Sequence, residues 1–188
     1  MTGLLISVRN RQEAETVLTA CPELDILDIK EPNAGALGAA PPQVWRDIAA
    51  INLNNTSLSI ALGELNEMPV NALAELPQKT QYAKVGLAHQ NGLNWTKAWR
   101  AMRALVLDSA ELVGVIYADY EAAAAPTPIE VIERLSSEGC GTFLVDTYQK
   151  KGDNLFDHLT REEFNQFKAM NPEAVFVLAG SLTESSIP

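Results

Sequence analysis

The chain has 188 residues, 47% of them hydrophobic, which is enough for one domain with a substantial core. Its 14 lysines and arginines are outnumbered by 24 aspartates and glutamates, which gives a formal net charge of -10. Nucleic acids and anionic membranes both select basic surfaces, so this balance argues against either as a partner. A phosphorylated substrate would need a local cluster of cations.

Targeting and membrane segments are not evident in the sequence. The apolar run before Arg9 is about five residues long, shorter than the core of a signal peptide. No stretch approaches the roughly 18 to 20 apolar residues of a transmembrane helix. Cys21 and Cys140 do not suggest a secreted disulfide scaffold. We therefore predict a single cytoplasmic domain over residues 1–188, and the sequence leaves its oligomeric state open, a homo-oligomer included.

Short segments rich in Val, Ile and Leu recur about every 30 residues and predict β-strands. They begin near residues 3, 24, 56, 82, 111, 142 and 174. Amphipathic stretches lie between most of them, and several start with a polar cap followed by an acid three positions later. These helix starts are Asn10 with Glu13, Thr127 with Glu130, and Thr160 with Glu163.

Strand after helix, repeated along the whole chain, predicts parallel strands joined by right-handed crossovers. Such a chain forms either a doubly wound open sheet or a (β/α)8 barrel. Charged residues in three of the strand segments distinguish the doubly wound sheet from the barrel. Side chains alternate along a strand, so these charged residues lie on one face of it and apolar residues on the other. These residues are Asp28, Lys30, Lys84 and Asp146.

A doubly wound sheet has helices on both faces and offers no shared interior for these charges, whereas a barrel does. We therefore predict an α/β fold of the TIM (β/α)8-barrel type, in which the charged side chains converge near the carboxyl ends of the strands. Seven strands are readable, and we expect the eighth to be missing at the C-terminus. Because that would leave two strand edges unpaired, we expect the 188-residue chain to be poorly soluble or marginally stable, with little activity.

Converging lysines and aspartates suggest lysine-based catalysis. A neutral lysine amine attacks carbonyl carbons, and nearby carboxylates move protons. The alternative is a structural cluster of ion pairs, since Lys and Asp are rarely buried unless paired. Asp28 and Asp146 favour an ammonium at Lys30, so the sequence alone does not fix its protonation state. His89 and His158 lack ligand partners at workable spacing, and we predict no metal.

Further candidates follow the predicted strands. Gly38 lies after the second segment and suits a close approach of a substrate to the backbone. Asp119 ends the fifth segment, and Lys150 comes just beyond the sixth. Gly180 and Ser181 end the seventh, where barrels of this type often bind phosphate. We predict substrate or phosphate binding at Gly38, Asp119, Gly180 and Ser181.

At these residues the sequence resembles the (5-formylfuran-3-yl)methyl phosphate synthases. The motifs occur in family order and span the chain: DIKEP, GALGA, YAKVGL, YAD, LVDT and LAGSL. DIKEP and GALGA together with YAKVGL form the most diagnostic pairing. The resemblance implies a TIM barrel that condenses two glyceraldehyde 3-phosphates into a phosphorylated furan aldehyde, for a methanofuran-type one-carbon carrier.

The resemblance also implies residue roles. Lys30 matches the family's Schiff-base lysine and Lys84 its proton acceptor. Asp28, Asp146 and Lys150 match other active-site positions and would move protons during cyclisation and dehydration. It further implies a phosphorylated triose as the partner and no cofactor, since the iminium withdraws the electrons. Two alternatives stay open: another Schiff-base aldolase of a phosphorylated sugar, and a non-catalytic truncated relative.

Overall fold

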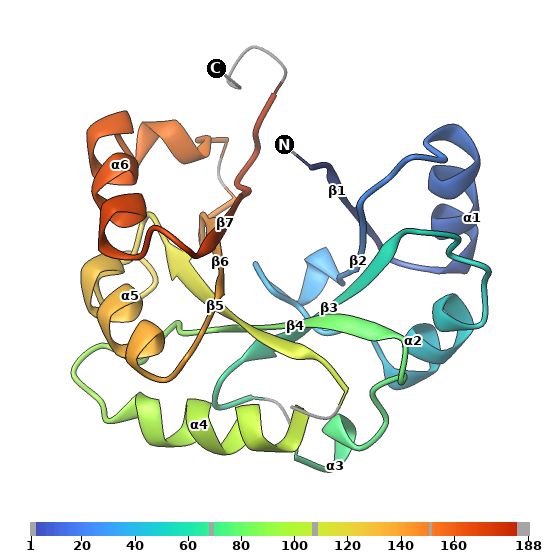
Figure 1. The fold of residues 1–188 in the computed structure, drawn as a ribbon, viewed down its shortest axis with the longest axis horizontal. Coiled ribbons are helices and arrows are strands. Elements are labelled where there is room, and N and C mark those ends of the chain that lie inside the picture. The colour runs from blue at the N-terminus through green and yellow to red at the C-terminus, as the bar shows by residue number, and fades with distance from the viewer. Residues whose placement is uncertain (1–2, 68–69, 107–108, 151, 184–188) are drawn as a thin grey trace. The chain divides into compact units, whose positions relative to one another are not determined.

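The computed structural model describes residues 3–67, 70–106, 109–150 and 152–183, along which strands and helices alternate (Figure 1). The strands are β1 (Leu5–Val8), β2 (Ile26–Ile29), β3 (Ser57–Glu64), β4 (Thr80–Gly86), β5 (Glu111–Tyr117), β6 (Thr142–Asp146) and β7 (Val175–Leu178). The α-helices are α1 (Arg11–Ala20), α2 (Pro42–Ala49), α3 (Val70–Leu73), α4 (Trp95–Val106), α5 (Pro128–Ser137) and α6 (Arg161–Met170). Two short 3-10 helices are η1 (Pro32–Ala34) and η2 (Leu155–Asp157).

The sheet contains the seven strands in chain order, β1-β2-β3-β4-β5-β6-β7. The pairs β1–β2, β2–β3, β5–β6 and β6–β7 are all parallel. Parallel strands in chain order, each joined to the next by a helical crossover, define an α/β fold of the TIM-barrel type. The predicted fold class and the seven predicted strand segments are therefore confirmed. Among the described residues, every helix is too short or too polar to cross a membrane.

The chain divides into two compact units, Met1–Val85 with Ala101–Leu112 and Gly86–Arg100 with Val113–Pro188. The prediction of a single domain stays a prediction. In the first unit, α1 and α2 lie along β1, β2 and β3 (Figure 1). The core on that side contains Leu27 and Ile60, both fully buried, and α2 contributes Trp45. Burial of these apolar side chains is the main force that holds helices to the sheet.

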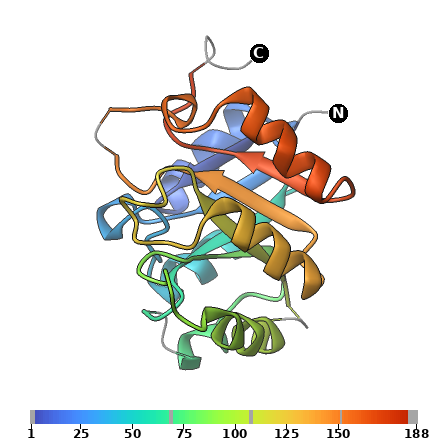
Figure 2. The same ribbon diagram turned by 90° about the vertical axis from the view of Figure 1, so that its left-hand side faces the viewer.

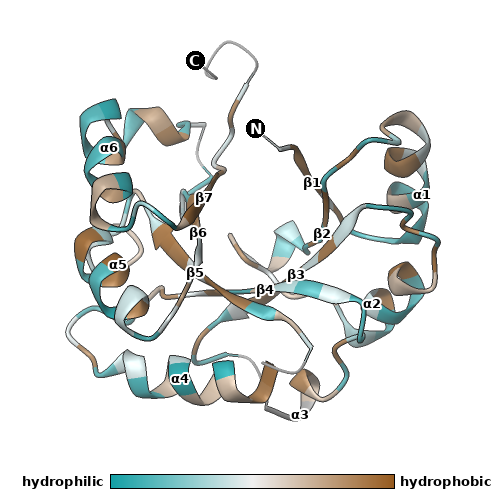
Figure 3. Cartoon of the chain, in the orientation of Figure 1, coloured by the Kyte–Doolittle hydropathy of each residue, from teal (hydrophilic) through white to brown (hydrophobic). Residues whose placement is uncertain are grey.

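In the second unit, α5 and α6 lie side by side along β6 and β7 (Figure 2). Figure 3 shows hydrophobic residues along β5 and β7, while α6 also carries hydrophilic ones. Gly114 on β5 lets α5 approach closely, because a Cβ there would lie 2.7 Å from Cδ1 of Leu135 and 3.0 Å from Cδ1 of Phe143. The packing around position 114 therefore leaves no room for a side chain.

All the predicted helix starts are confirmed. The side-chain oxygens of Asn10, Thr127 and Thr160 accept hydrogen bonds from the backbone N–H groups of the acids three positions later. At α6 the bond is reciprocal, since the Glu163 carboxylate accepts from the Thr160 N–H at 2.8 Å. Side-chain oxygens satisfy N–H groups that have no partner within the first helical turn, so these caps fix where the helices begin.

Candidate active site

A buried ion pair joins β2 and β4 in the first unit. Lys84 Nζ lies 2.6 Å from Asp28 Oδ1, and the two side chains are 5% and 0% exposed. The other carboxylate oxygen of Asp28 accepts a hydrogen bond from Ser7 Oγ at 2.9 Å. Because a buried charge is strongly disfavoured without an opposite charge, each of these groups holds the other in place. The structure therefore brings Asp28 and Lys84 together.

Lys30 comes directly after β2 in the same unit. Its backbone N–H donates to the Val8 carbonyl at 3.1 Å, which continues the β1–β2 ladder past the last residue of the strand. It lies two positions after Asp28, so the alternation of side chains places both on one side of the strand, roughly 7 Å apart along it. Its side chain is partly exposed. Lys30 thus lies nearer the carboxyl end of the strand than the buried pair does.

The loop after Lys30 folds back on itself at Gly38. The Glu31 N–H donates to the Gly38 carbonyl at 2.8 Å, and the Gly63 N–H on β3 donates to the Leu37 carbonyl at 2.8 Å. A Cβ on Gly38 would lie 2.0 Å from the Glu31 carbonyl oxygen. Backbone therefore packs directly on backbone here, and this explains the glycine. The predicted contact of Gly38 with substrate stays a prediction.

A second lysine–carboxylate pair lies in the second unit, just after β6. Lys150 Nζ lies 2.7 Å from Asp146 Oδ1, with Asp146 2% and Lys150 39% exposed. The same lysine donates to Thr147 Oγ1 at 3.2 Å, and the Thr147 N–H donates to Asp146 Oδ1 at 2.8 Å. This pair differs from the first because its lysine reaches solvent. Lys150 can exchange protons with water while the buried Asp146 carboxylate stays in place.

Asp119 holds the turn that leads to Lys150. Its two carboxylate oxygens accept hydrogen bonds from the backbone N–H groups of Tyr148 and Gln149, at 2.7 and 2.9 Å. A carboxylate that accepts from two backbone donors is a strong, charge-assisted clamp. The structure therefore shows Asp119 bound to protein backbone, while its predicted contact with substrate stays a prediction.

The side chain of Tyr148 on this turn packs between two rings. Its hydroxyl lies 3.4 Å from His89 Nε2, and its ring meets that of Tyr117 edge to face with centroids 5.4 Å apart. By spacing alone His89 has no ligand partner, so the sequence assigns it no role. Nothing in the sequence could have linked His89 to a tyrosine 59 positions away, since the contact depends on the folded chain. His89 helps to fix the turn that carries Lys150.

Gly180 packs against the same turn. It has φ of +105°, and a Cβ there would lie 3.1 Å from Cγ2 and Oγ1 of Thr147. Its carbonyl accepts from the Leu155 N–H at 2.9 Å. Ser181 also has a left-handed backbone, with φ of +53°, and is exposed. Such backbone is uncommon outside glycine and is found in loops with tightly constrained geometry. Phosphate binding at Gly180 and Ser181 stays a prediction.

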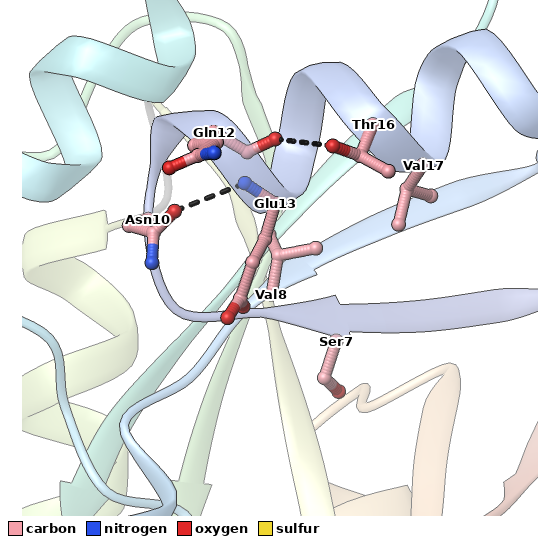
Figure 4. A pocket seen from close by; sticks show the side chains of 7 residues that line it. All are labelled: Ser7, Val8, Asn10, Gln12, Glu13, Thr16 and Val17. Carbon is pink, nitrogen blue, oxygen red and sulfur yellow. Dashed lines mark hydrogen bonds between the residues drawn. The ribbon is translucent and has the colours of Figure 1, made fainter.

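A pocket lies between β1 and the start of α1 in the first unit (Figure 4). Glu13 lines it, and its backbone N–H is already taken by the Asn10 side chain. The Arg9 guanidinium donates to the Glu13 carboxylate and holds the pKa of that carboxyl below its usual range. The lining residues that the structure describes include this carboxylate but no lysine or arginine, so the pocket is poorly suited to the predicted phosphorylated substrate. Ser7, which also lines it, is the residue bonded to Asp28.

Metal ligands are not gathered at either lysine–carboxylate pair. Within residues 3–67, 70–106, 109–150 and 152–183, no three His, Cys, Asp or Glu side chains form a group that could hold a metal ion.

Both lysine–carboxylate pairs lie toward the carboxyl ends of their strands, as the catalytic groups of (β/α)-barrel enzymes do. The chain thus has the fold of such enzymes and carries charged side chains where they keep their catalytic groups. The model of the 4-HFC-P synthase family matches residues 4–188, and the chain belongs to this family.

Two curated relatives carry the name (5-formylfuran-3-yl)methyl phosphate synthase. The protein of Methanopyrus kandleri is 32% identical over 196 residues, which cover 98% of this chain and 81% of that protein. The protein of Methanobrevibacter smithii is 30% identical over 197 residues, with 98% and 81% covered.

A solved structure from Streptococcus agalactiae, described as the copper homeostasis protein CutC, superposes with a TM-score of 0.59. It is 10% identical, and the match covers 96% of this chain and 99% of that one. This likeness shows the fold alone.

Proposed function

We propose that the chain condenses two molecules of glyceraldehyde 3-phosphate into (5-formylfuran-3-yl)methyl phosphate through a Schiff base on Lys30. The observation that carries the proposal is the family match over residues 4–188, together with relatives named for this product. We further propose that the product supplies a methanofuran-type one-carbon carrier.

The first half of the reaction uses the residues of the first unit. The Lys30 amine attacks the aldehyde of one triose phosphate, water leaves, and the iminium acidifies the C–H of the adjoining carbon. Lys84 is an ammonium in the resting ion pair, so it first passes one proton to the Asp28 carboxylate, 2.6 Å away, and then takes the C–H proton as a neutral amine. Ser7 holds the other carboxylate oxygen of Asp28, and the ion pair forms again when the extra proton moves to the oxygen of the second aldehyde. The resulting enamine attacks the aldehyde of the second triose phosphate.

The second half of the reaction is cyclisation, elimination and release. We assign its proton transfers to Asp146 and Lys150, because this pair combines a fixed carboxylate with a lysine that reaches solvent. The atoms balance when one phosphate and two waters leave the two triose phosphates. Water also hydrolyses the iminium, which returns Lys30 to its amine. Formation of the aromatic furan makes the sequence effectively irreversible.

Reductive trapping tests the assignment of Lys30. Borohydride added with glyceraldehyde 3-phosphate reduces an iminium to a stable amine, so the peptide that contains Lys30 gains the mass of a triose-phosphate adduct. Lys30→Arg keeps the charge but cannot form the adduct, and it should be neither labelled nor active. Lys168→Arg, at an exposed position of α6, is the matched control and should be labelled like the parent.

Two results would contradict the mechanism. A triose adduct on a different lysine would move the Schiff base away from Lys30. Unchanged labelling in Lys30→Arg would show that trapping does not report on this residue at all.

A further inference from the structure

A row of three polar residues crosses the first unit at the level of the buried pair. The strand register aligns Ser7 on β1 with Asp28 on β2, and Asp28 with Ser59 on β3. Residues aligned in neighbouring parallel strands point to the same side of the sheet. Ser7 uses this placement to bond Asp28. Ser59 therefore faces the side on which the Asp28–Lys84 ion pair is formed.

Ser59 lies on the strand between the two partners of the ion pair. Asp28 lies on β2 and Lys84 on β4, and β3 is the strand between them. Since Ser59 is the β3 residue aligned with Asp28, its side chain points to the side of the sheet on which the ion pair is formed. A large side chain would block the 2.6 Å contact, which explains why the residue is small. It does not explain the hydroxyl, because alanine is as small.

The hydroxyl of Ser59 is the unexplained group. The residue is 1% exposed, and within the described part of the chain its Oγ has no hydrogen-bond partner. A buried hydroxyl without a partner destabilises the fold, so each one in a native protein calls for an explanation. A partner that arrives with the substrate is such an explanation.

We propose that Ser59 is a specificity-determining residue whose hydroxyl binds the 2-hydroxyl of the triose phosphate. The inference rests on the proposed function. Lys84 takes its proton from the carbon next to the iminium, and in glyceraldehyde 3-phosphate this carbon carries the 2-hydroxyl. The Ser59 hydroxyl, in the same row as Asp28, thus offers a hydrogen bond to the 2-hydroxyl, which lies beside the C–H bond that Lys84 breaks.

The test compares two aldehydes on two proteins. Glyceraldehyde 3-phosphate and 3-oxopropyl phosphate differ only in the 2-hydroxyl, and both can form an iminium that borohydride traps. The concentration that half-saturates trapping is measured for each aldehyde in the parent and in Ser59→Ala. The preference for the hydroxylated aldehyde should fall about 3- to 10-fold in Ser59→Ala, which is the loss of one hydrogen bond. Half-saturation by 3-oxopropyl phosphate should not change.

Thr80→Val is the matched control. Thr80 is also buried, at 2% exposure, and its hydroxyl likewise lacks a partner among the described residues. It begins β4, four residues before Lys84 and so roughly 13 Å away along the strand. This variant should keep the parent's preference between the two aldehydes. Both variants should melt at or above the parent's temperature, because each removes an unpaired buried hydroxyl.

The outcomes separate this inference from the proposed function. An unchanged preference in Ser59→Ala, or an equal loss for both aldehydes, overturns the role of Ser59 alone. A melting temperature lowered in Ser59→Ala but not in Thr80→Val would show that the hydroxyl has a partner inside the protein, and it overturns the inference too. If the parent forms no triose adduct on any lysine, the proposed function fails and this inference fails with it.

Discussion

Removing the ammonium of Lys84 should destabilise the fold as well as stop the reaction. Lys84→Met keeps most of the side-chain volume but leaves the Asp28 carboxylate, which is 0% exposed, without its ion-pair partner. Breaking one side of a buried ion pair lowers the free energy of unfolding by about 3–5 kcal/mol. For a chain of this length that corresponds to a melting temperature lower by about 6–20 °C.

The assay is thermal unfolding of a double-mutant cycle. Asp28→Asn with Lys84→Met removes both charges. The double variant should therefore melt well above the temperature expected if the losses in the two single variants were additive. Lys168→Met, at an exposed position, controls for the loss of a lysine and should stay within about 0.5 kcal/mol of the parent. Below its melting temperature, Lys84→Met should still be trapped at Lys30 while furan synthesis falls about 100- to 10,000-fold. A Lys84→Met variant that melts like the parent would refute the reasoning.

Three smaller predictions follow from single contacts. Gly38→Ala places a Cβ where the Glu31 carbonyl now lies, so borohydride trapping should slow as the loop after the Schiff-base lysine shifts. Asp119→Asn removes one of two backbone acceptors, and amide hydrogen exchange at Tyr148 or its neighbour should speed up; unchanged exchange would show that the clamp is not needed. The backbone N–H of Thr160, and after it the Thr160 hydroxyl, donate to the Glu163 carboxylate and lower its pKa below the ordinary 4.5, so Thr160→Ala, which removes the hydroxyl alone, should raise the pKa measured by NMR titration part of the way. Because a lowered acid pKa stabilises the fold above that range and is lost in acid, the stability gap between this variant and the parent should narrow as the pH falls; a constant gap would contradict it.

The strands and helix caps could be predicted from sequence because both depend on residues close together in the chain. Seven apolar segments became seven strands, and a polar residue followed by an acid three positions later marked the start of α1, α5 and α6. The segment between residues 70 and 77 contains only the single turn of α3. Local signals therefore account for most of the element order.

Side-chain alternation also predicted part of the site. It placed Asp28 and Lys84 on inward faces, and the structure shows them in contact. It could not show that Asp119 is bonded to a turn 29 and 30 residues away, or that Ser7 bonds a residue 21 positions away. Such contacts depend on how crossovers bring distant strand ends together, which no local pattern encodes.

Glycine at position 38 illustrates a different limit. Sequence reasoning attributed it to a close approach of substrate, and the structure shows a close approach of the Glu31 carbonyl. Both explanations require the absence of a Cβ, so the residue type cannot distinguish them. Only the positions of the neighbouring atoms do.

The central claim is that the chain makes a furan from glyceraldehyde 3-phosphate, and product analysis with that single substrate tests it most directly. Phosphorus NMR combined with mass spectrometry should show one inorganic phosphate released for each (5-formylfuran-3-yl)methyl phosphate formed. Lys30→Arg, incubated in parallel, should form neither. Conversion of the substrate to an isomeric triose phosphate or to an open-chain aldol adduct, without furan, would contradict the account.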